Sequence, residues 1–170
     1  MTPDSLQFKS RRFLFADGSL DPESGIGFGA YLSIEEESVN LNCLRQSVKT
    51  KRFENTSPSK LELQSLLWAL SEVDEPEIEV YTDSQTIIDL PSRKERLIAS
   101  RFLSKRGNPI RNRMLYKALF EIFDRRNIRL HWVKGHKPTK EKTQIDQCFS
   151  IVDRASRTAL RSFMKTTETG

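Results

Sequence analysis

The N-terminal third of the chain shows the alternation of apolar with small or polar residues that is typical of β-strands. Phe13 and Phe15 belong to a short run that stops at Asp17-Gly18-Ser19, which predicts a strand followed by a turn. Residues 27–34 predict a second strand, whose glycines indicate close packing or a bulge, and residues 39–49 predict a third. We therefore expect an antiparallel meander in this part of the chain.

Farther along, apolar residues recur every three to four positions, which is the spacing of amphipathic helices. Leu63, Leu66 and Leu70 form such a stripe after a proline-containing stretch of cap residues at 56–59. The remaining pattern predicts, in order, a strand at 78–81, a short helix starting at 87, a helix and a loop within 93–113, a helix at 114–123, a strand at 128–133 and a terminal helix at 145–163. This order predicts an α/β domain whose sheet mixes antiparallel and parallel pairs.

A chain of 170 residues is long enough for one domain with a substantial core. We place this domain at residues 11–165, between a short mobile arm at 1–10 and a C-terminal tail at 166–170. No apolar run approaches the length of a membrane span, and the start of the chain lacks the basic and apolar regions of a signal peptide. Cys43 and Cys148 lack metal-ligand spacing, so we expect a cytoplasmic monomer with two reduced thiols.

The net charge of +5 is concentrated in one segment. Between positions 93 and 113 there are eight basic residues and one acid, so this segment carries +7 and the rest of the chain is slightly acidic. A solvated helix face would interleave acids with bases, so we favour a nucleic-acid-binding patch. Its basic residues are Arg93, Lys94, Arg96, Arg101, Lys105, Arg106, Arg111 and Arg113. A lysine-rich loop follows at 137–144, with Lys137, Lys140 and Lys142.

Four carboxylates stand out by their settings. Asp17 and Asp83 follow apolar strand patterns, whereas Glu62 and Asp153 lie within helical patterns. A fold that brings them together creates a concentration of negative charge that a hard cation neutralises. Two such cations side by side can catalyse phosphodiester hydrolysis. Each residue alone also fits an ordinary turn or a solvated helix position, so only the combination favours a site.

Five short motifs resemble those of ribonuclease H type 1 and occur in the order of that family. They are Asp17-Gly18-Ser19, Glu62-Leu63, Thr82-Asp83-Ser84-Gln85, Trp132-Val133-Lys134-Gly135-His136 and Asp153-Arg154-Ala155-Ser156-Arg157-Thr158-Ala159. Each motif alone is weak, but the resemblance covers the chain from about residue 11 to 159. It implies an α/β RNase H-like fold, in which three antiparallel strands and two parallel ones form a five-stranded mixed sheet flanked by helices.

The resemblance also implies an activity, the endonucleolytic cleavage of the RNA strand of an RNA–DNA hybrid with two Mg²⁺ ions, or with Mn²⁺ as a substitute. Carried over position by position, the metal ligands are Asp17, Glu62, Asp83 and Asp153. His136 corresponds to a mobile histidine that assists proton transfer or product release.

For the substrate, the resemblance matches residues 93–113 with the basic handle that grips the DNA strand in the bacterial enzymes. The contacts implied there are Arg93, Lys94, Arg101, Lys105, Arg106, Arg111 and Arg113. Ser57, Ser59 and Gln85 correspond to residues that line the minor groove near the cut, where the 2′-hydroxyls of RNA are displayed.

One spacing departs from the family pattern. About ten residues separate the histidine from the last aspartate in the bacterial enzymes. Here the separation is 17 residues from His136 to Asp153, and ten from His136 to Asp146. The motif favours Asp153, with Asp146 as a capping or loop carboxylate. The two lie about 10 Å apart along a helix axis, so both cannot hold the same metal pair. The longer loop leaves the position of His136 open.

Two other classes of function remain open on the sequence alone. A non-catalytic module that binds hybrids or double-stranded RNA would keep the fold and the basic handle, but it has no need for four acids near phosphate. Another enzyme of the same fold, such as a reverse-transcriptase domain, an exonuclease or an integrase, resembles the chain less around residues 82–85 and the histidine loop. We expect Trp68 and Trp132 to belong to the core and His131 to pack or face solvent.

Overall fold

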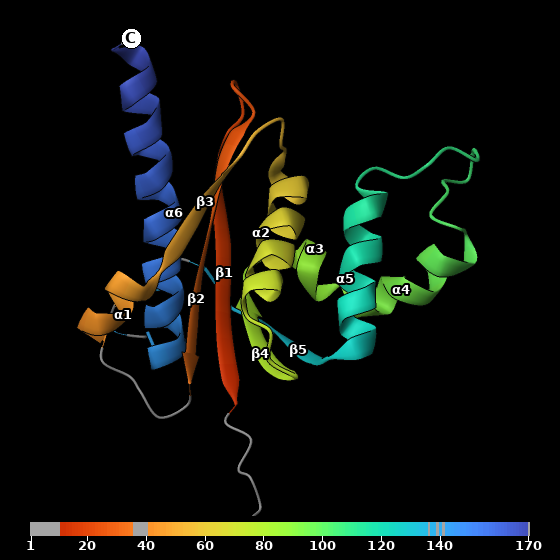
Figure 1. Cartoon of the computed structure of the whole chain (residues 1–170), viewed down its shortest axis with the longest axis horizontal. Helices are drawn as coiled ribbons and strands as arrows, with labels where there is room; N and C mark the ends of the chain where they lie inside the picture. Colours follow the sequence, from red (N-terminus) through yellow and green to blue (C-terminus); the bar gives the residue numbers. More distant parts are fainter. Residues whose placement is uncertain (1–10, 36–40, 136, 139, 141, 170) are drawn as a thin grey trace, which may run out of the picture.

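The computed structural model describes residues 11–35, 41–135, 137–138, 140 and 142–169. For residues 41–43 it describes the backbone only. At its centre is a five-stranded sheet with the strand order β3-β2-β1-β4-β5 (Figure 1). The strands are β1 (Arg12–Asp21), β2 (Ile26–Glu35), β3 (Lys49–Phe53), β4 (Glu77–Thr82) and β5 (Asn127–Trp132). β1 to β3 pair antiparallel, whereas β4 and β5 run parallel to β1, so the predicted mixed sheet is confirmed.

Helices cover both faces of this sheet (Figure 1). One face carries α1 (Leu41–Ser47) and α6 (Gln144–Glu168). The other carries α2 (Pro58–Glu72), α3 (Gln85–Ile88), α4 (Leu90–Ala99) and α5 (Arg113–Arg125). α6 continues into the segment expected as a tail, and no helix within the described residues has both the length and the apolar character needed to cross a membrane.

Alternation along β1 sends neighbouring side chains into two separate apolar layers. Leu14 packs with Val80 against α2 and α5, whereas Phe15 packs with Leu32 against Val152 of α6. Because β1 lies in the middle of the sheet, both of its faces are buried. The central strand is therefore a rigid support for any residue that it carries.

The third strand was predicted in the wrong place. Within the described part of the predicted strand, residues 41–47 form α1, and β3 starts at Lys49 and ends at Phe53. β3 is an edge strand whose side chains are exposed except for the half-buried Phe53. Its sequence therefore lacks the apolar alternation by which strands are recognised, and its basic residues are typical of a protected sheet edge.

The first strand is also longer than predicted. Asp17 does not begin a turn but lies inside β1, opposite Ala30 of β2, and the ladder continues to the pair Asp21–Ile26. The turn follows at Asp21, whose carboxylate accepts hydrogen bonds from the backbone and the hydroxyl of Ser24. Gly18 and Ser19 predicted a turn after Asp17, but small residues also occur where a helix packs closely on two paired strands.

The glycines of β1 and β2 allow α2 to lie unusually close to the sheet. A Cβ atom on Gly29 would lie 2.4 Å from Oγ of Ser65, and one on Gly18 would lie 2.9 Å from the side chain of Leu61. Larger residues would push the helix away from the sheet. The prediction of close packing is therefore confirmed, and the contact brings Glu62 of α2 to the level of β1.

The segment between α4 and α5 protrudes from the rest of the molecule (Figure 1). It is nevertheless ordered by local contacts, since the backbone N–H of Ile110 donates to the carbonyl of Phe102 and the buried ring of Phe102 lies beside Phe120. The predicted helix followed by a loop at residues 107–109 is confirmed. The expected arm at 1–10 and His136 lie outside the described residues.

Candidate active site

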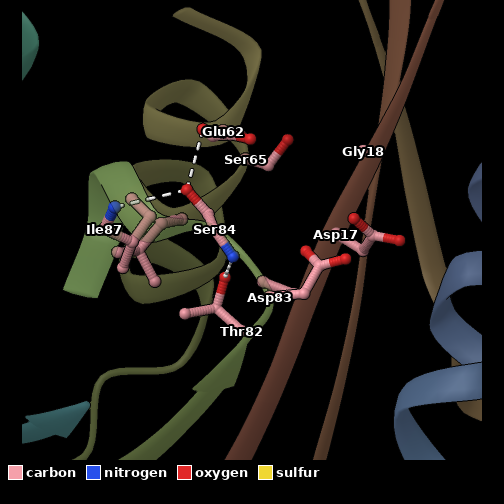
Figure 2. Close-up of a pocket in the computed structure, with 10 residues that line it drawn as sticks. Asp17, Gly18, Glu62, Ser65, Thr82, Asp83, Ser84 and Ile87 are labelled. Carbon is pink, nitrogen blue, oxygen red and sulfur yellow. Dashed lines mark hydrogen bonds between the residues drawn. The ribbon is translucent and has the colours of Figure 1, made fainter. Parts of the chain in front are cut away.

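Asp17 and Asp83 are brought together by the register of two parallel strands. In the β1–β4 ladder Phe15 lies opposite Tyr81, and each aspartate follows two residues later. Their side chains therefore leave neighbouring strands on the same face, the face that α6 covers. Figure 2 shows the two carboxylates directed toward one another. Two residues before these aspartates, the rings of Phe15 and Tyr81 stack with their centroids 5.1 Å apart.

Asp153 joins this pair from α6, and its side chain is hydrogen-bonded to that of Asp17. The position of the helix is set by Ser156, which is fully buried and whose Oγ lies 2.9 Å from Oγ of Ser19 in β1. One turn of helix after Asp153, Nε of Arg157 lies 3.1 Å from its carboxylate. Three acids from β1, the end of β4 and α6 thus meet at one place.

The pKa of Asp17 is raised mainly because its carboxyl group is buried, and the neighbouring acids add to the shift. Burial raises the pKa of Asp17 from 3.8 to about 8, with further contributions from the charge of Asp83 and the hydrogen bond to Asp153. The hydrogen bond from the backbone N–H of Gly18 lowers the pKa of Asp17, but by less than the other effects raise it. At neutral pH the site therefore holds a proton that a metal cation could replace.

Glu62 lies on the opposite side of this group and is held by a short network. Oγ of Ser84 donates to Oε2 of Glu62 over 2.7 Å, and the same Oγ accepts the backbone N–H of Ile87 at the start of α3 (Figure 2). The backbone N–H of Ser84 in turn donates to Oγ1 of Thr82. Among the described residues, no group of three or more acidic, histidine or cysteine side chains is arranged so that it could hold a metal ion. Glu62 faces the same pocket as Asp17 and Asp83 but points toward Ser84.

Asp146 is a capping residue at the start of α6. Its carboxylate accepts the backbone N–H and the hydroxyl of Thr143, which completes a capping box at the start of α6, and it forms an ion pair with Lys137 at 3.2 Å. Burial alone would raise the pKa of Asp146, but the bonds from Thr143 and Lys137 together lower it. The prediction that Asp146 is a capping carboxylate is confirmed, and Asp153 is the aspartate that lies beside Asp17.

Comparison with known proteins decides the family. The family model for RNase H matches residues 9–152 of this chain. The chain belongs to the RNase H family. Ribonuclease HI of Haemophilus influenzae is 29% identical over 138 residues, which cover 79% of this chain and 84% of that protein. Ribonuclease H of Psychromonas ingrahamii is 30% identical over 142 residues, covering 78% and 84%, and that of Rhizobium etli is 29% identical over 141 residues, covering 79% and 85%.

Membership of the RNase H family confirms the predicted fold and the prediction that the protein is an enzyme of the ribonuclease H type. The matched range ends one residue before Asp153. The place of Asp153 in the site therefore rests on the packing of α6 and its contact with Asp17.

The basic segment 93–113 surrounds a groove of about 770 Å³ on the α3 and α4 side of the carboxylates. Its lining includes Arg93, Arg96, Lys105 and Arg111, together with Ser59. Arg101 and Arg106 are exposed in the protruding loop, and Arg113 opens α5. Lys94 forms an ion pair with Asp124 of α5.

Two of the other predicted substrate residues lie at the starts of helices. Ser57 is the N-cap residue of α2, although its side chain makes no capping hydrogen bond. Nε2 of Gln85 donates to Asp89 over 2.8 Å at the exposed surface of α3. The histidine segment begins beside the acids, because a Cβ on Gly135 would lie 3.6 Å from Oδ2 of Asp83.

The aromatic residues are only partly as predicted. Trp132 is 56% exposed, so its assignment to the core is wrong. It is the last residue of β5, an edge strand of the sheet. Trp68 is half-buried and meets Tyr31 edge-to-face. His131 packs on Tyr81 and is hydrogen-bonded to Glu79, while its side chain is 42% exposed, so both of the expected alternatives apply in part.

Sequence reasoning did not single out Ser84, Ser156 or Arg157 as supports of the acidic residues. The available signal for Ser84 was its position after Asp83 and three residues before the apolar Ile87, which is the pattern of an N-cap. For Arg157 it was the i, i+4 spacing from Asp153, which places two side chains on one helix face.

Proposed function

We propose that this member of the RNase H family cleaves the RNA strand of RNA–DNA hybrids endonucleolytically, using two divalent metal ions. The observation that carries the proposal is the meeting of Asp17, Asp83 and Asp153 from three separate elements, with the pKa of Asp17 raised to about 8. Carboxylate oxygens are the ligands that Mg²⁺ and Mn²⁺ prefer, so the residues present fit these ions. The ligands would be these three aspartates and Glu62.

A pair of such ions, when bound, supplies an activated water and stabilises the charge that develops on the phosphate and the leaving oxygen. The chain's own contribution is to hold the acids in place. Asp17 lies on β1, the central strand of the sheet, and Asp83 directly follows its neighbour β4, while the Ser19–Ser156 hydrogen bond joins α6 to β1. Ser84 keeps the carboxylate of Glu62 from turning to solvent. His136 is proposed to assist proton transfer or product release.

The basic handle is proposed to bind the DNA strand. The groove beside Arg93, Lys105 and Arg111 lies next to α3, which starts directly after Asp83 and Ser84. A duplex held in this groove would present its other strand to the acids. Ser57, Ser59 and Gln85 are proposed to contact the minor groove of the hybrid near the cut.

Purified protein and three labelled duplexes test the proposal directly. RNA–DNA, RNA–RNA and DNA–DNA duplexes are each incubated with Mg²⁺ or with EDTA, and the products are separated by size. We expect internal cleavage of the RNA strand of the hybrid with Mg²⁺ alone. Binding without cleavage would support a non-catalytic module, and cleavage of DNA would support another nuclease of this fold.

The metal ligands are tested by the charge-neutral variants Asp17→Asn and Asp83→Asn. Since metal assistance contributes several kcal/mol to such reactions, we expect kcat to fall about a thousandfold or more. Hybrid binding, measured by fluorescence anisotropy, should remain, because the basic handle is separate from these residues. Retained turnover in either variant would refute the assignment.

A further inference from the structure

The lysine-rich loop that follows β5 faces a second hollow beside the carboxylates. This hollow has a volume of about 90 Å³ and lies between the loop and α6, and Asp83 and Asp153 form part of its wall. Four cationic side chains complete the lining. They are Lys134, Lys137, Lys142 and Arg157.

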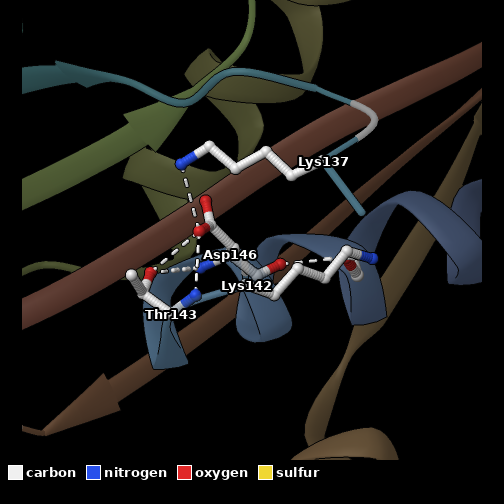
Figure 3. A network of polar contacts seen from close by, with 5 residues as sticks. Lys137, Lys142, Thr143 and Asp146 are labelled. Carbon is white, nitrogen blue, oxygen red and sulfur yellow. Dashed lines mark hydrogen bonds and ion pairs between the residues drawn. The ribbon is translucent and has the colours of Figure 1, made fainter. Parts of the chain in front are cut away.

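Local contacts hold three of these cations at the hollow. Lys137 forms the ion pair with Asp146, and Nζ of Lys142 donates to Oγ of Ser150 over 3.0 Å (Figure 3). Arg157 is paired with Asp153. Lys134 forms no ion pair with any described residue. Lys137 and Lys142 therefore turn toward α6, whereas the side chains of a solvated charge run would turn outward.

The charges of the hollow do not cancel once the acids are used for catalysis. The proposed function assigns Asp83 and Asp153 to divalent cations, which leaves Asp146, the ion-pair partner of Lys137, as the remaining acid among the described lining residues. Four cations facing one acid make a site for an anion. The anion that must lie next to Asp83 and Asp153 in the proposed reaction is the phosphate backbone of the strand that is cut.

We propose that Lys134, Lys137, Lys142 and Arg157 form a subsite for a backbone phosphate of the RNA strand, adjacent to the phosphate that is cleaved. This inference rests on the proposed function and adds to it a contact separate from the basic handle. The two basic regions lie on opposite faces of the sheet, because the hollow is lined by α6 whereas the handle groove is lined by α3 and α4. Each strand of the hybrid thus has its own set of cations.

Asp146 is the ion-pair partner of Lys137 in this subsite. Its carboxylate is 7% exposed and is fixed by Thr143, so the lysine has a rigid partner at one end of the hollow. The side chain of Lys137 itself is 32% exposed and remains accessible to a phosphate. An amine held by one acid can donate further hydrogen bonds, because an ammonium group carries three N–H donors.

The subsite is tested by Lys137→Gln, Lys142→Gln and the double variant, with Lys165→Gln near the end of α6 as a charge control. Binding of a labelled RNA–DNA hybrid is measured by anisotropy in EDTA over a range of salt concentrations. We expect the double variant to bind about 3- to 10-fold more weakly and its salt slope to be about 1 to 2 smaller in magnitude. The proposal would be overturned if the salt slope of the double variant were equal to that of the control Lys165→Gln.

Asp146→Asn separates charge from loop geometry. This variant loses the partner of Lys137 but leaves every cation of the hollow in place. If the lysines act by charge, binding should be unchanged or tighter. If Asp146→Asn weakens binding as much as Lys137→Gln does, the loop conformation is responsible and the subsite proposal fails.

The strand is identified by replacing single phosphates with neutral methylphosphonates along the RNA or the DNA strand. In the wild-type protein we expect one or two RNA positions next to the cleavage point to lose affinity, and the loss should disappear in the double lysine variant. The inference would be overturned if the lysine-dependent loss of affinity occurred at positions of the DNA strand, or if no position showed a loss that depends on the lysines. Cleavage of the unmodified hybrid by the wild-type protein with Mg²⁺ tests the proposed function separately, so the two failures are distinguishable.

Discussion

At the scale of single residues, the site depends on a few neutral side chains that hold the acids in place. Ser84 is 4% exposed and bonds at once to Glu62 and to the first turn of α3. Ser156 joins α6 to β1 through Ser19. Because carboxylate ligands must adopt one geometry to bind Mg²⁺, such partners affect metal affinity nearly as strongly as ligands do.

We expect Ser84→Ala to weaken metal binding about 10- to 100-fold, since Glu62 loses its hydrogen-bond donor. The affinity is measured without substrate by titration calorimetry with Mn²⁺. Loss of the N-cap also costs about 1 kcal/mol of stability, which a thermal melt detects. Ser84→Thr keeps a hydroxyl and serves as control. Equal Mn²⁺ affinity in all three proteins would contradict the role of Ser84.

The raised pKa of Asp17 predicts how the metal-free protein responds to pH. In the range between 3.8 and about 8 the folded protein binds the proton more tightly than the unfolded chain does. The stabilisation is therefore complete below pH 3.8 and is lost as the pH rises toward 8. In EDTA, the Tm should fall as the pH rises from 3.8 toward about 8, and Asp17→Asn should reduce this fall. Added Mg²⁺ should restore stability at the higher pH, because it replaces the proton.

At the scale of elements, the distance between α2 and the sheet determines where Glu62 lies. That distance depends on Gly29, above which Ser65 leaves no room for a side chain. The helix itself begins at a proline and buries a stripe of leucines against β1 and β2, so its position along the sheet is well determined.

Gly29→Ala is expected to destabilise the protein by about 1–3 kcal/mol, because the new Cβ atom overlaps Oγ of Ser65. The free energy of unfolding is measured by urea denaturation. In a Ser65→Ala background, where that oxygen is absent, the cost of the same substitution should be smaller. Equal costs in both backgrounds would show that α2 is free to move away from the sheet.

The elements also show what the sequence could and could not predict. α2, β4 and α6 have strong periodicity and were found, whereas the edge strand β3 has no buried alternation and was misplaced. The four acids were identified from their motifs. The Ser84–Glu62 bond and the cations around Asp153 depend on side-chain directions that a linear pattern does not contain.

At the scale of the whole molecule, acids lie between two basic regions. The basic handle lies on the α3 and α4 side and the loop lysines on the α6 side. A polyanionic duplex can therefore bind close to four carboxylates, because cations on both sides offset their repulsion.

The basic handle is tested by reversing the charge of Arg101, Lys105 and Arg106 together. We expect weaker hybrid binding and a salt slope that is smaller by about 0.9 for each phosphate that these side chains no longer neutralise. Lys94→Gln is the matched control, because Lys94 is already paired with Asp124 and should contribute less. A triple variant with an unchanged slope would remove the handle from the binding surface.

The pairing of Ser19 with Ser156 has a consequence for how such chains diverge. Because α6 is docked through its middle, residues can be inserted or deleted before Thr143 without moving Asp153 relative to β1. A change of loop length before α6 should therefore leave Asp153 beside Asp17. Counting ten residues from the histidine selects Asp146, the capping residue of α6, whereas the packing of the helix places Asp153 next to Asp17.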